Sequence, residues 1–306
     1  MIRARGISKR FGDTTAVDDL SFGVERGEIF GIVGPDGAGK STLLRMIAGI
    51  LPPDSGSIEV DGVDVASDPF AIKENLAYMP QRFGLYEDLT VEENIHFFGR
   101  VFGVSRAEIR KREKGLYEFS RLAPFRERLA GKLSGGMKQK LGLACCLVHR
   151  PGLILLDEPT NGVDPVSRRE FWKILYGLLS EGVTIVVSTA YLDEAERCNR
   201  VALMYEGRFV LTGTPGEIKA SMGGSLVEIR PSDVWKAEAA LAESGEFGTV
   251  IREGTALRFF VPDARRADAR IRAVLSRKGI RAGTAMVKTP SLENCFMEII
   301  SGGGGR

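Results

Sequence analysis

Residues 34–41 read Gly-Pro-Asp-Gly-Ala-Gly-Lys-Ser, between an apolar run at 28–33 and a helical pattern at 42–48. In a loop of this G-x-x-x-x-G-K-S form, successive backbone N–H groups face phosphate oxygens, and the helix that follows presents its positive end to them. The lysine reaches the β and γ phosphates, and the serine can bind Mg²⁺. The sequence therefore predicts a nucleoside triphosphate site made by Gly34, Pro35, Asp36, Gly37, Ala38, Gly39, Lys40, Ser41 and Thr42.

Composition sets limits on the rest of the chain. Its 306 residues favour one large domain with a smaller one. A net charge of +2, from 42 basic and 40 acidic residues, shows no bias toward nucleic acid or an acidic membrane surface. No apolar run approaches the roughly 20 residues of a membrane-spanning helix. The N-terminus lacks the apolar core of a signal peptide, so we expect a cytosolic chain that does not cross a bilayer.

The hydrophobic periodicity predicts an α/β protein. Short antiparallel strands lead into the phosphate loop, and two continuous apolar runs have the spacing of buried parallel strands on either side of a helix that begins at 164–165. A segment with helical periodicity, about 88–150, interrupts the mixed sheet. Expected strands cover 2–28, 57–62, 75–81, 153–156 and 183–187.

The pattern changes after residue 223. A β-α-β-β-α-β order is expected, with strands at 225–230, near 247–252, at 256–261 and at 280–287 and helices at 232–244 and 263–278. This order is compatible with a small α+β domain of ferredoxin-like type over 224–300. Residues 301–306 are expected to form a flexible tail. The four cysteines show no metal-binding spacing and are expected to be buried.

Two further motifs narrow the class of nucleotide site. Leu153 to Glu158 is an apolar strand that ends in two acids, which places Asp157 beside the Mg²⁺ and Glu158 near the γ phosphate. Ser134, Gly135 and Gly136 form a turn before the third helix of the helical segment, and such a turn offers N–H groups to an anion.

With these motifs in order, residues 1–221 resemble the ATP-binding subunits of ABC transporters, whose P-loop cassette contains a helical subdomain. In that family two cassettes enclose two ATP molecules head to tail. The resemblance implies that Phe11 stacks on adenine, that Gln81 touches Mg²⁺ and faces the permease, and that Ser41 and Asp157 bind the metal ion. It implies ATP and Mg²⁺ as cofactors.

The same resemblance assigns the remaining roles. Glu158 matches the general base that polarises the attacking water, and Asp164 belongs to the loop through which two cassettes communicate. Ser134, Gly135 and Gly136 match the signature residues that bind the γ phosphate held by the opposite chain.

Three positions depart from the family pattern. Ala190 stands where the family has a histidine that contacts the γ phosphate, and the loss of one such polar contact costs about 3 kcal/mol in the transition state. Asp36 adds a charge near the triphosphate that repels it by about 1 to 2 kcal/mol at roughly 10 Å. Met137 replaces the glutamine that usually follows the signature turn. We therefore expect ATP binding with impaired hydrolysis.

Three functions follow from the resemblance. The strings at 83–94, 133–143, 188–196 and 291–296 are most similar to ATPases of the ABC-2 exporter class, including bacterial multidrug exporters. Such a subunit would power a separate permease from the cytoplasmic face of the inner membrane, as a homodimer or with a second ABC ATPase. The alternative is a regulatory, largely non-hydrolysing cassette paired with a competent partner. A soluble ABC ATPase acting on ribosomes or DNA is a third possibility, but no nucleic acid is expected.

Overall fold

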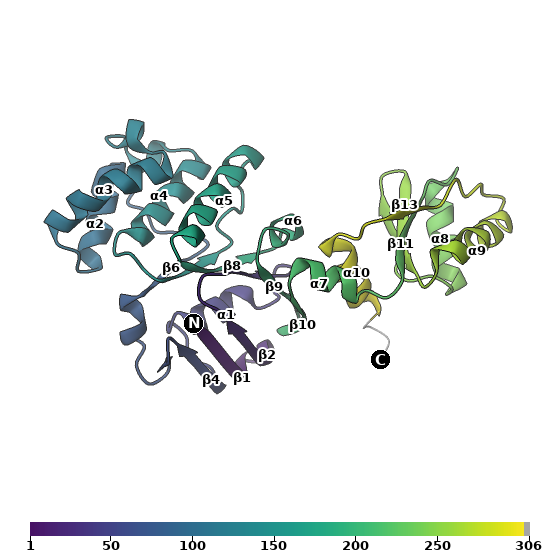
Figure 1. The fold of residues 1–306 in the computed structure, drawn as a ribbon, viewed down its shortest axis with the longest axis horizontal. Coiled ribbons are helices and arrows are strands. Elements are labelled where there is room, and N and C mark those ends of the chain that lie inside the picture. The colour runs from purple at the N-terminus through teal and green to yellow at the C-terminus, as the bar shows by residue number, and fades with distance from the viewer. Residues whose placement is uncertain (303–306) are drawn as a thin grey trace. The chain divides into compact units, whose positions relative to one another are not determined.

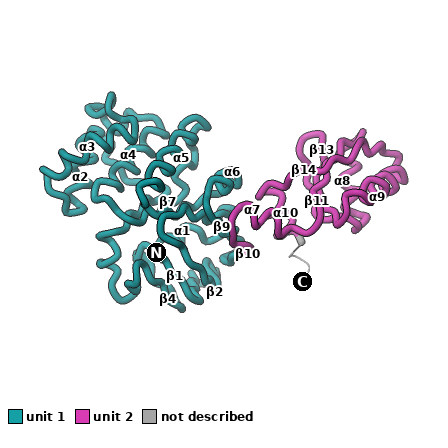
Figure 2. The backbone as a smooth tube through the Cα atoms, in the orientation of Figure 1, with its two compact units in different colours: residues 1–209 teal, residues 210–306 magenta. Residues whose placement is uncertain are grey.

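The computed structural model describes residues 1–302, and the chain divides into two compact units, 1–209 and 210–306 (Figure 1; Figure 2). The division lies earlier than the expected cassette end at residue 221. Helix α7 (Pro215–Ser221) contacts α10 (Leu292–Gly302), so it groups with the second unit. Of the expected tail 301–306, the first two residues end α10, and 303–306 lie outside the described residues.

A six-stranded sheet with the order β10-β9-β3-β8-β7-β6 forms the centre of the first unit. Neighbouring strands from β9 to β6 run parallel. Every residue of β3, β7 and β8 is buried, which explains why these strands read as continuous apolar runs. The bounds are β3 Ile29–Val33, β6 Leu76–Met79, β7 Leu153–Asp157, β8 Thr184–Thr189, β9 Arg200–Tyr205 and β10 Arg208–Gly213.

A second sheet with the order β2-β1-β4-β5 is antiparallel, and α1 (Lys40–Ile47) contacts strands of both sheets. Apolar residues of the two sheets and α1 form one buried cluster, which includes Ile7, Phe30 and Leu44. The phosphate loop is therefore fixed from both sides. The strands are β1 Ile2–Phe11, β2 Thr14–Val24, β4 Ser55–Val60 and β5 Val63–Asp64.

The expected helical segment forms a group of three helices, α2 (Val91–Val101), α3 (Arg106–Ser120) and α4 (Gly135–Leu147), which contact one another (Figure 1). Thr90 caps α2 in a reciprocal capping box with Glu93. Helix α4 also contacts β6 and α5 (Pro165–Ser180), which ties the group to the sheet. Short helices complete this unit: η1 Ala71–Glu74, η2 Ala123–Phe125, η3 Ala130–Lys132 and α6 Leu192–Ala195.

The second unit contains a four-stranded antiparallel sheet with the order β12-β13-β11-β14. Two helices, α8 and α9, pack on it around Phe259, Ile271 and Leu275. The chain order is β11-α8-β12-β13-α9-β14, followed by α10, which the sequence analysis did not predict. The bounds are β11 Ser225–Ile229, α8 Val234–Ser244, β12 Ile251–Glu253, β13 Ala256–Val261, α9 Ala264–Ser276 and β14 Met286–Lys288.

The expected strand at 280–287 is mostly wrong, since β14 begins at Met286. Gly283 has φ +72°, and a Cβ there would lie 2.4 Å from the carbonyl oxygen of Arg230. A strand cannot continue through that conformation. Ile280 and Ala282 are nevertheless buried in the core of the unit, which explains their apolar, strand-like pattern.

Glu228 on β11 is a buried carboxylate that several cations surround. The guanidinium of Arg258 lies 2.9 Å from Oε2, and Arg230 and Lys288 lie 3.6 and 3.7 Å from Oε1. The hydrogen bond from Arg258, followed by the charges of Lys288 and Arg258, lowers the pKa of Glu228 below its ordinary value of 4.5. A carboxyl group whose pKa is lowered in the folded state stabilises the fold at pH values above its pKa in the unfolded state. This contribution to the free energy of unfolding is lost as the pH falls through the pKa of the folded state.

We predict that Glu228→Gln makes the free energy of unfolding less dependent on pH below 4.5. The free energy of unfolding of the wild-type chain should fall more steeply than that of the variant as the pH is lowered below 4.5, because only the wild type must protonate this carboxylate. Urea unfolding followed by circular dichroism at a series of pH values measures both slopes. Equal slopes would contradict the prediction.

Candidate nucleotide site

The phosphate loop joins β3 to α1, and close backbone contacts require its glycines. A Cβ on Gly34 would lie 2.1 Å from the carbonyl oxygen of Met204, and one on Gly39 would lie 2.0 Å from that of Ala16. Gly37 has φ +80° and Gly39 φ +103°. These are conformations that other residues adopt at a cost, so the loop depends on these three positions being glycine.

Lys40, the first residue of α1, is 4% exposed and turns its ammonium group back toward the loop. Its Nζ donates hydrogen bonds to the carbonyl oxygens of Gly34 and Pro35 at 2.8 and 2.9 Å. The same Nζ lies 3.1 Å from Oε1 of Glu158. A phosphate that binds Lys40 must compete with Glu158, and Lys40 thereby couples the loop to the end of β7.

Asp157 joins the ends of three strands and α1. Its Oδ1 accepts hydrogen bonds from Ser41 Oγ at 2.9 Å and from Ser188 Oγ at 2.8 Å. Mg²⁺ binds six oxygens at 2.0–2.1 Å, so two adjacent ligand oxygens are about 2.9 Å apart. The separation between Ser41 and Asp157 therefore fits adjacent ligands of Mg²⁺.

Tyr78 of β6 is a site residue that the sequence analysis missed. Its hydroxyl donates a hydrogen bond to Oδ2 of Asp157 at 3.2 Å. Burial and the charge of Asp157 raise the pKa of Tyr78 to about 12, so the hydroxyl remains a neutral donor at physiological pH. Ser188 was missed as well. Both lie near the carboxyl ends of strands that flank β7, which is the available sequence signal, because ligands bind at that edge of a parallel sheet.

Glu158 follows β7 with φ +47°, an uncommon conformation for a residue other than glycine. Its backbone N–H is held by Ser188, whose Oγ and carbonyl oxygen lie at 3.0 and 3.2 Å. Its Oε2 accepts hydrogen bonds from Gln81 Nε2 at 2.9 Å and from Asn161 Nδ2 at 3.1 Å. The structure thus brings Gln81 and Glu158 together and fixes the direction of the carboxylate.

A cavity of about 250 Å³ opens beside Glu158. Its lining consists of Asp36, Glu158, Thr160, Asn161, Thr189, Ala190 and Tyr191. Ala190 therefore presents a methyl group to the same cavity as Glu158, and Asp36 adds a second carboxylate to the wall. The two histidines, His96 and His149, lie outside this lining, in α2 and just after α4.

Glu194 of α6 is completely buried and ties the two sides of this cavity together. Its Oε1 accepts a hydrogen bond from Thr160 at 2.6 Å, and its Oε2 accepts one from Thr189 at 2.8 Å. Arg168 Nε lies 3.5 Å from Oε1, and its guanidinium stacks 4.0 Å from the ring centroid of Tyr191. Glu194 thereby joins the segment after Glu158 to the residue before Ala190.

The remaining predicted residues lie on other elements. Ser134 is the N-cap of α4, and a Cβ on Gly136 would lie 2.6 Å from Cβ of Ser167 on α5. Helix α4 belongs to the helical group, whereas α1 lies beside the sheets (Figure 1). Phe11 ends β1, and its side chain is half exposed. Asp164 caps α5 by accepting hydrogen bonds from two backbone N–H groups.

Asp164 also has a lowered pKa, and the hydrogen bond with Ser167 is the largest cause. It is therefore an ionised helix cap in this chain.

The four cysteines are all buried, as expected, and none of them forms a disulfide within the described residues.

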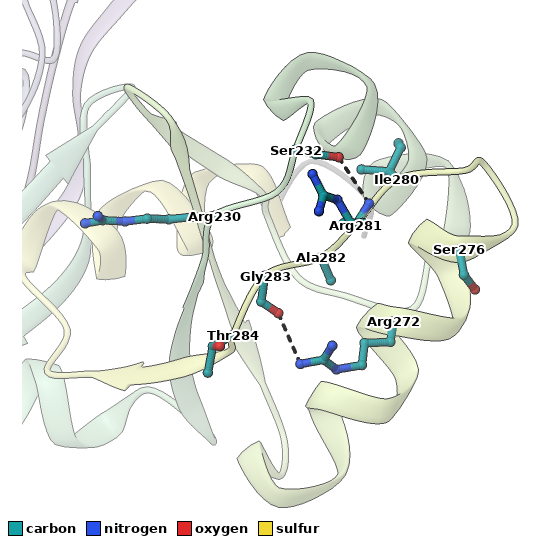
Figure 3. Close-up of a pocket in the computed structure, with 9 residues that line it drawn as sticks. All are labelled: Arg230, Ser232, Arg272, Ser276, Ile280, Arg281, Ala282, Gly283 and Thr284. Carbon is teal, nitrogen blue, oxygen red and sulfur yellow. Dashed lines mark hydrogen bonds between the residues drawn. The ribbon is translucent and has the colours of Figure 1, made fainter.

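The basic residues of the second unit are largely paired with acids. Arg270, Arg272 and Lys278 lie 2.9, 2.8 and 3.4 Å from Glu246, Asp268 and Glu243. Arg272 also donates a hydrogen bond to the carbonyl oxygen of Gly283 at 3.2 Å, inside a pocket that Arg281 lines as well (Figure 3). Two of the arginines of α9, Arg270 and Arg272, are therefore paired with nearby acids.

Several features together define a P-loop nucleotide hydrolase. They are the phosphate loop, the start of α1 behind it, the buried Asp157 at the end of β7 and the strand order of the central sheet. The chain matches the ABC transporter family over residues 17–161. It is 38% identical over 303 residues to the daunorubicin/doxorubicin resistance ATP-binding protein DrrA of Streptomyces peucetius, across 97% of this chain and 92% of that protein. The chain therefore belongs to the ATP-binding proteins of ABC transporters and is an ABC ATPase.

Two further similarities bear on this assignment. The chain is 51% identical over 226 residues to the probable multidrug ABC transporter ATP-binding protein YbhF of Escherichia coli (strain K12), across 73% of this chain and 39% of that protein. It thus spans well under half of YbhF. The dimeric, post-hydrolysis cassette MJ0796 bound to ADP and Pi superposes with a TM-score of 0.64 and 26% identity, over 70% of this chain and 98% of that one. Among the helices of residues 1–302, none combines the length and apolar character of a membrane span.

We predict that Glu194→Gln slows ATP hydrolysis by roughly ten- to a hundredfold, because small misplacements of catalytic groups have effects of that size. The amide keeps the volume of the side chain but accepts hydrogen bonds on one side only. Steady-state kcat and KM for ATP measure the effect, and KM should change little. Asp193→Asn, one residue earlier and exposed, is the matched control. Equal kcat values for the two variants would contradict a positioning role for Glu194.

Proposed function

We propose that the chain is the ATPase subunit of an exporter of the ABC-2 class and that it drives a separate membrane permease. The observation that carries this proposal is the junction of Lys40, Asp157 and Glu158 at the carboxyl edge of the sheet. The names of its relatives, which describe drug resistance and multidrug transport, favour export. The permease would hold the chain at the cytoplasmic face of the inner membrane as a peripheral subunit.

In this proposal the phosphate loop and Lys40 bind the triphosphate, and the half-exposed ring of Phe11 stacks on adenine. Ser41, Gln81 and Asp157 would hold Mg²⁺, which neutralises charge on the phosphates when it is bound. Glu158 accepts a proton from the water that attacks the γ phosphorus. Gln81 and Asn161 orient the carboxylate for that proton transfer, because both donate to its Oε2.

A second cassette would complete each site. The signature turn Ser134 to Gly136 begins α4, a helix of the helical group. Ser134 Oγ accepts the N–H of Met137, and the first N–H groups of a helix lack intrahelical partners and can bind an anion. We propose that this turn binds the γ phosphate held by another chain, and that Asp164 contributes from the cap of α5. The second cassette is either a copy of this chain or a different ABC ATPase.

Ala190 favours a second candidate function, a regulatory cassette that binds ATP and hydrolyses it poorly. The cavity beside Glu158 has a methyl group where a hydrogen-bond donor would contact the γ phosphate. The chain would then donate its signature turn to a competent partner. Residues 224–300 would serve as an accessory domain in either function, and the local pairing of arginines in that domain favours a solvated surface over a nucleic-acid site.

We predict that Ala190→His raises the rate of ATP hydrolysis by about 10²- to 10³-fold, the usual effect of one preorganised donor. Steady-state phosphate release by the purified chain measures this rate, and Glu158→Gln supplies the background. An increase of that size identifies a site impaired by Ala190. If Ala190→His and the wild type have equal rates above the Glu158→Gln background, the chain is a self-sufficient ATPase and the proposed impairment is wrong.

A further inference from the structure

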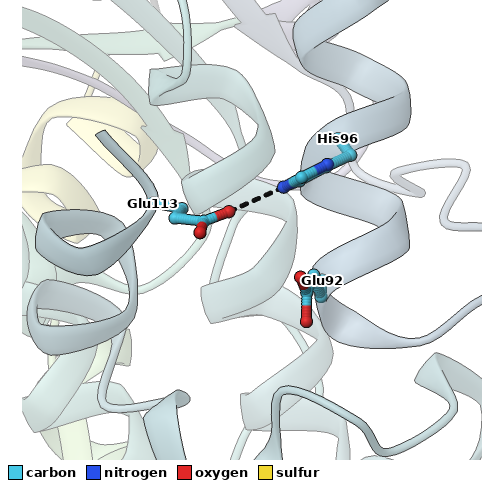
Figure 4. Close-up of side chains that lie close together, drawn as sticks. All are labelled: Glu92, His96 and Glu113. Carbon is cyan, nitrogen blue, oxygen red and sulfur yellow. Dashed lines mark hydrogen bonds and ion pairs between the residues drawn. The ribbon is translucent and has the colours of Figure 1, made fainter. Parts of the chain in front are cut away.

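Three side chains that the nucleotide site does not use converge between α2 and α3 (Figure 4). Glu92 and His96 lie one turn apart on α2, and Glu113 faces them from α3. One ligand atom from each residue lies within 4.8 Å of the others, and His96 Nε2 lies 2.6 Å from Glu113 Oε2. All three residues are partly exposed, so the cluster is open to solvent.

The charges of this cluster are incompletely matched. The carboxylate of Glu92 has no hydrogen bond or ion pair within the described part of the chain. Arg126 pairs with Glu127 at 3.2 Å, and the charge of Glu92 also contributes to its raised pKa. Two carboxylates therefore lie near one imidazole, and only Glu113 is hydrogen-bonded to it. A neutral imidazole is a metal ligand through its free nitrogen, and a cation at this point would offset the repulsion between the two acids.

Tyr117 supplies an independent observation. It follows Glu113 by one turn of α3, it is 7% exposed, and its hydroxyl has no hydrogen-bond partner among the described residues. Burial raises the pKa of Tyr117, with the charges of Glu92 and Glu113 as the next largest causes, so the hydroxyl is a protonated donor whose titration both acids influence. A donor of this kind commonly orients a carboxylate that binds a metal.

We propose that Glu92, His96 and Glu113 bind a divalent transition-metal ion of the zinc class. One imidazole nitrogen and two carboxylate oxygens form a ligand set that zinc accepts, with the fourth position left to water. Tetrahedral ligands at about 2.0–2.1 Å are roughly 3.3 Å apart. The glutamate side chains would reach this separation by changes of rotamer, while His96 would exchange its contact with Glu113 for the metal.

Such an ion would link α2 to α3. Both helices contact α4, whose first turn carries Ser134 to Gly136. The metal would therefore stiffen the helical group that presents the signature turn.

The test uses the full chain without a histidine tag, freed of metal with a chelator and kept without nucleotide. Isothermal titration with Zn²⁺ and the absorption spectrum of the Co²⁺ form report binding and ligand type. We expect the wild-type chain to bind one ion. Glu92→Gln should lose at least about tenfold in affinity for Zn²⁺, as other single changes around a metal do. His96→Gln should not bind the ion. Tyr117→Phe should weaken binding by a similar factor while the protein stays folded.

The control is His149→Gln, because His149 is the one other histidine of the chain. It should bind Zn²⁺ as the wild type does. Wild-type affinity in His96→Gln would overturn the proposal. If Glu92→Gln binds Zn²⁺ as tightly as the wild type does, the proposal is overturned too. The cluster would then be an ordinary His96–Glu113 ion pair, and the bound metal would be adventitious. Circular dichroism of each variant separates loss of binding from loss of folding.

Discussion

The buried pair of Lys40 and Glu158, 3.1 Å apart, is the interaction on which the nucleotide site depends. Lys40 begins α1, and Glu158 follows the central strand β7, so the pair connects the phosphate loop to the hydrolytic side of the site. Charges that leave water need partners, and here each charge has several. Lys40 binds two loop carbonyls, and Glu158 binds Gln81 and Asn161. The ammonium group of Lys40 and the carboxylate of Glu158 are thus each held by fixed partners.

A second, wholly buried acid extends this arrangement to the far side of the cavity. Glu194 accepts hydrogen bonds from Thr160, which follows β7, and from Thr189, which ends β8, so it joins the two loops that flank Glu158. Ala190 lies in the second of these loops. The frame around the site is therefore complete, and the loss of a polar contact that we propose at Ala190 would be confined to one side chain.

The sequence predicted the phosphate loop, β7 with its two acids and the parallel strands, because each has a local pattern: glycine spacing or apolar runs. It did not predict roles at the site for Tyr78, Ser188 or Glu194. Each of these residues has a hydrogen-bond partner more than 30 residues away, which the order of the strands brings close. The strand expected at 280–287 was misplaced because burial of Ile280 and Ala282 looks like strand periodicity, while the left-handed Gly283 has no local signature. The contact between α7 and α10, which groups α7 with the second unit, is distant in sequence and has no local pattern.

The central claim is that Glu158 competes with the phosphates for Lys40. Isothermal titration of the wild type and of Glu158→Gln with a non-hydrolysable ATP analogue and Mg²⁺ tests it most directly. The account predicts about tenfold tighter binding by the variant, because removal of one close negative charge is worth about 1.4 kcal/mol at a partly screened site. Equal or weaker binding by Glu158→Gln would contradict it.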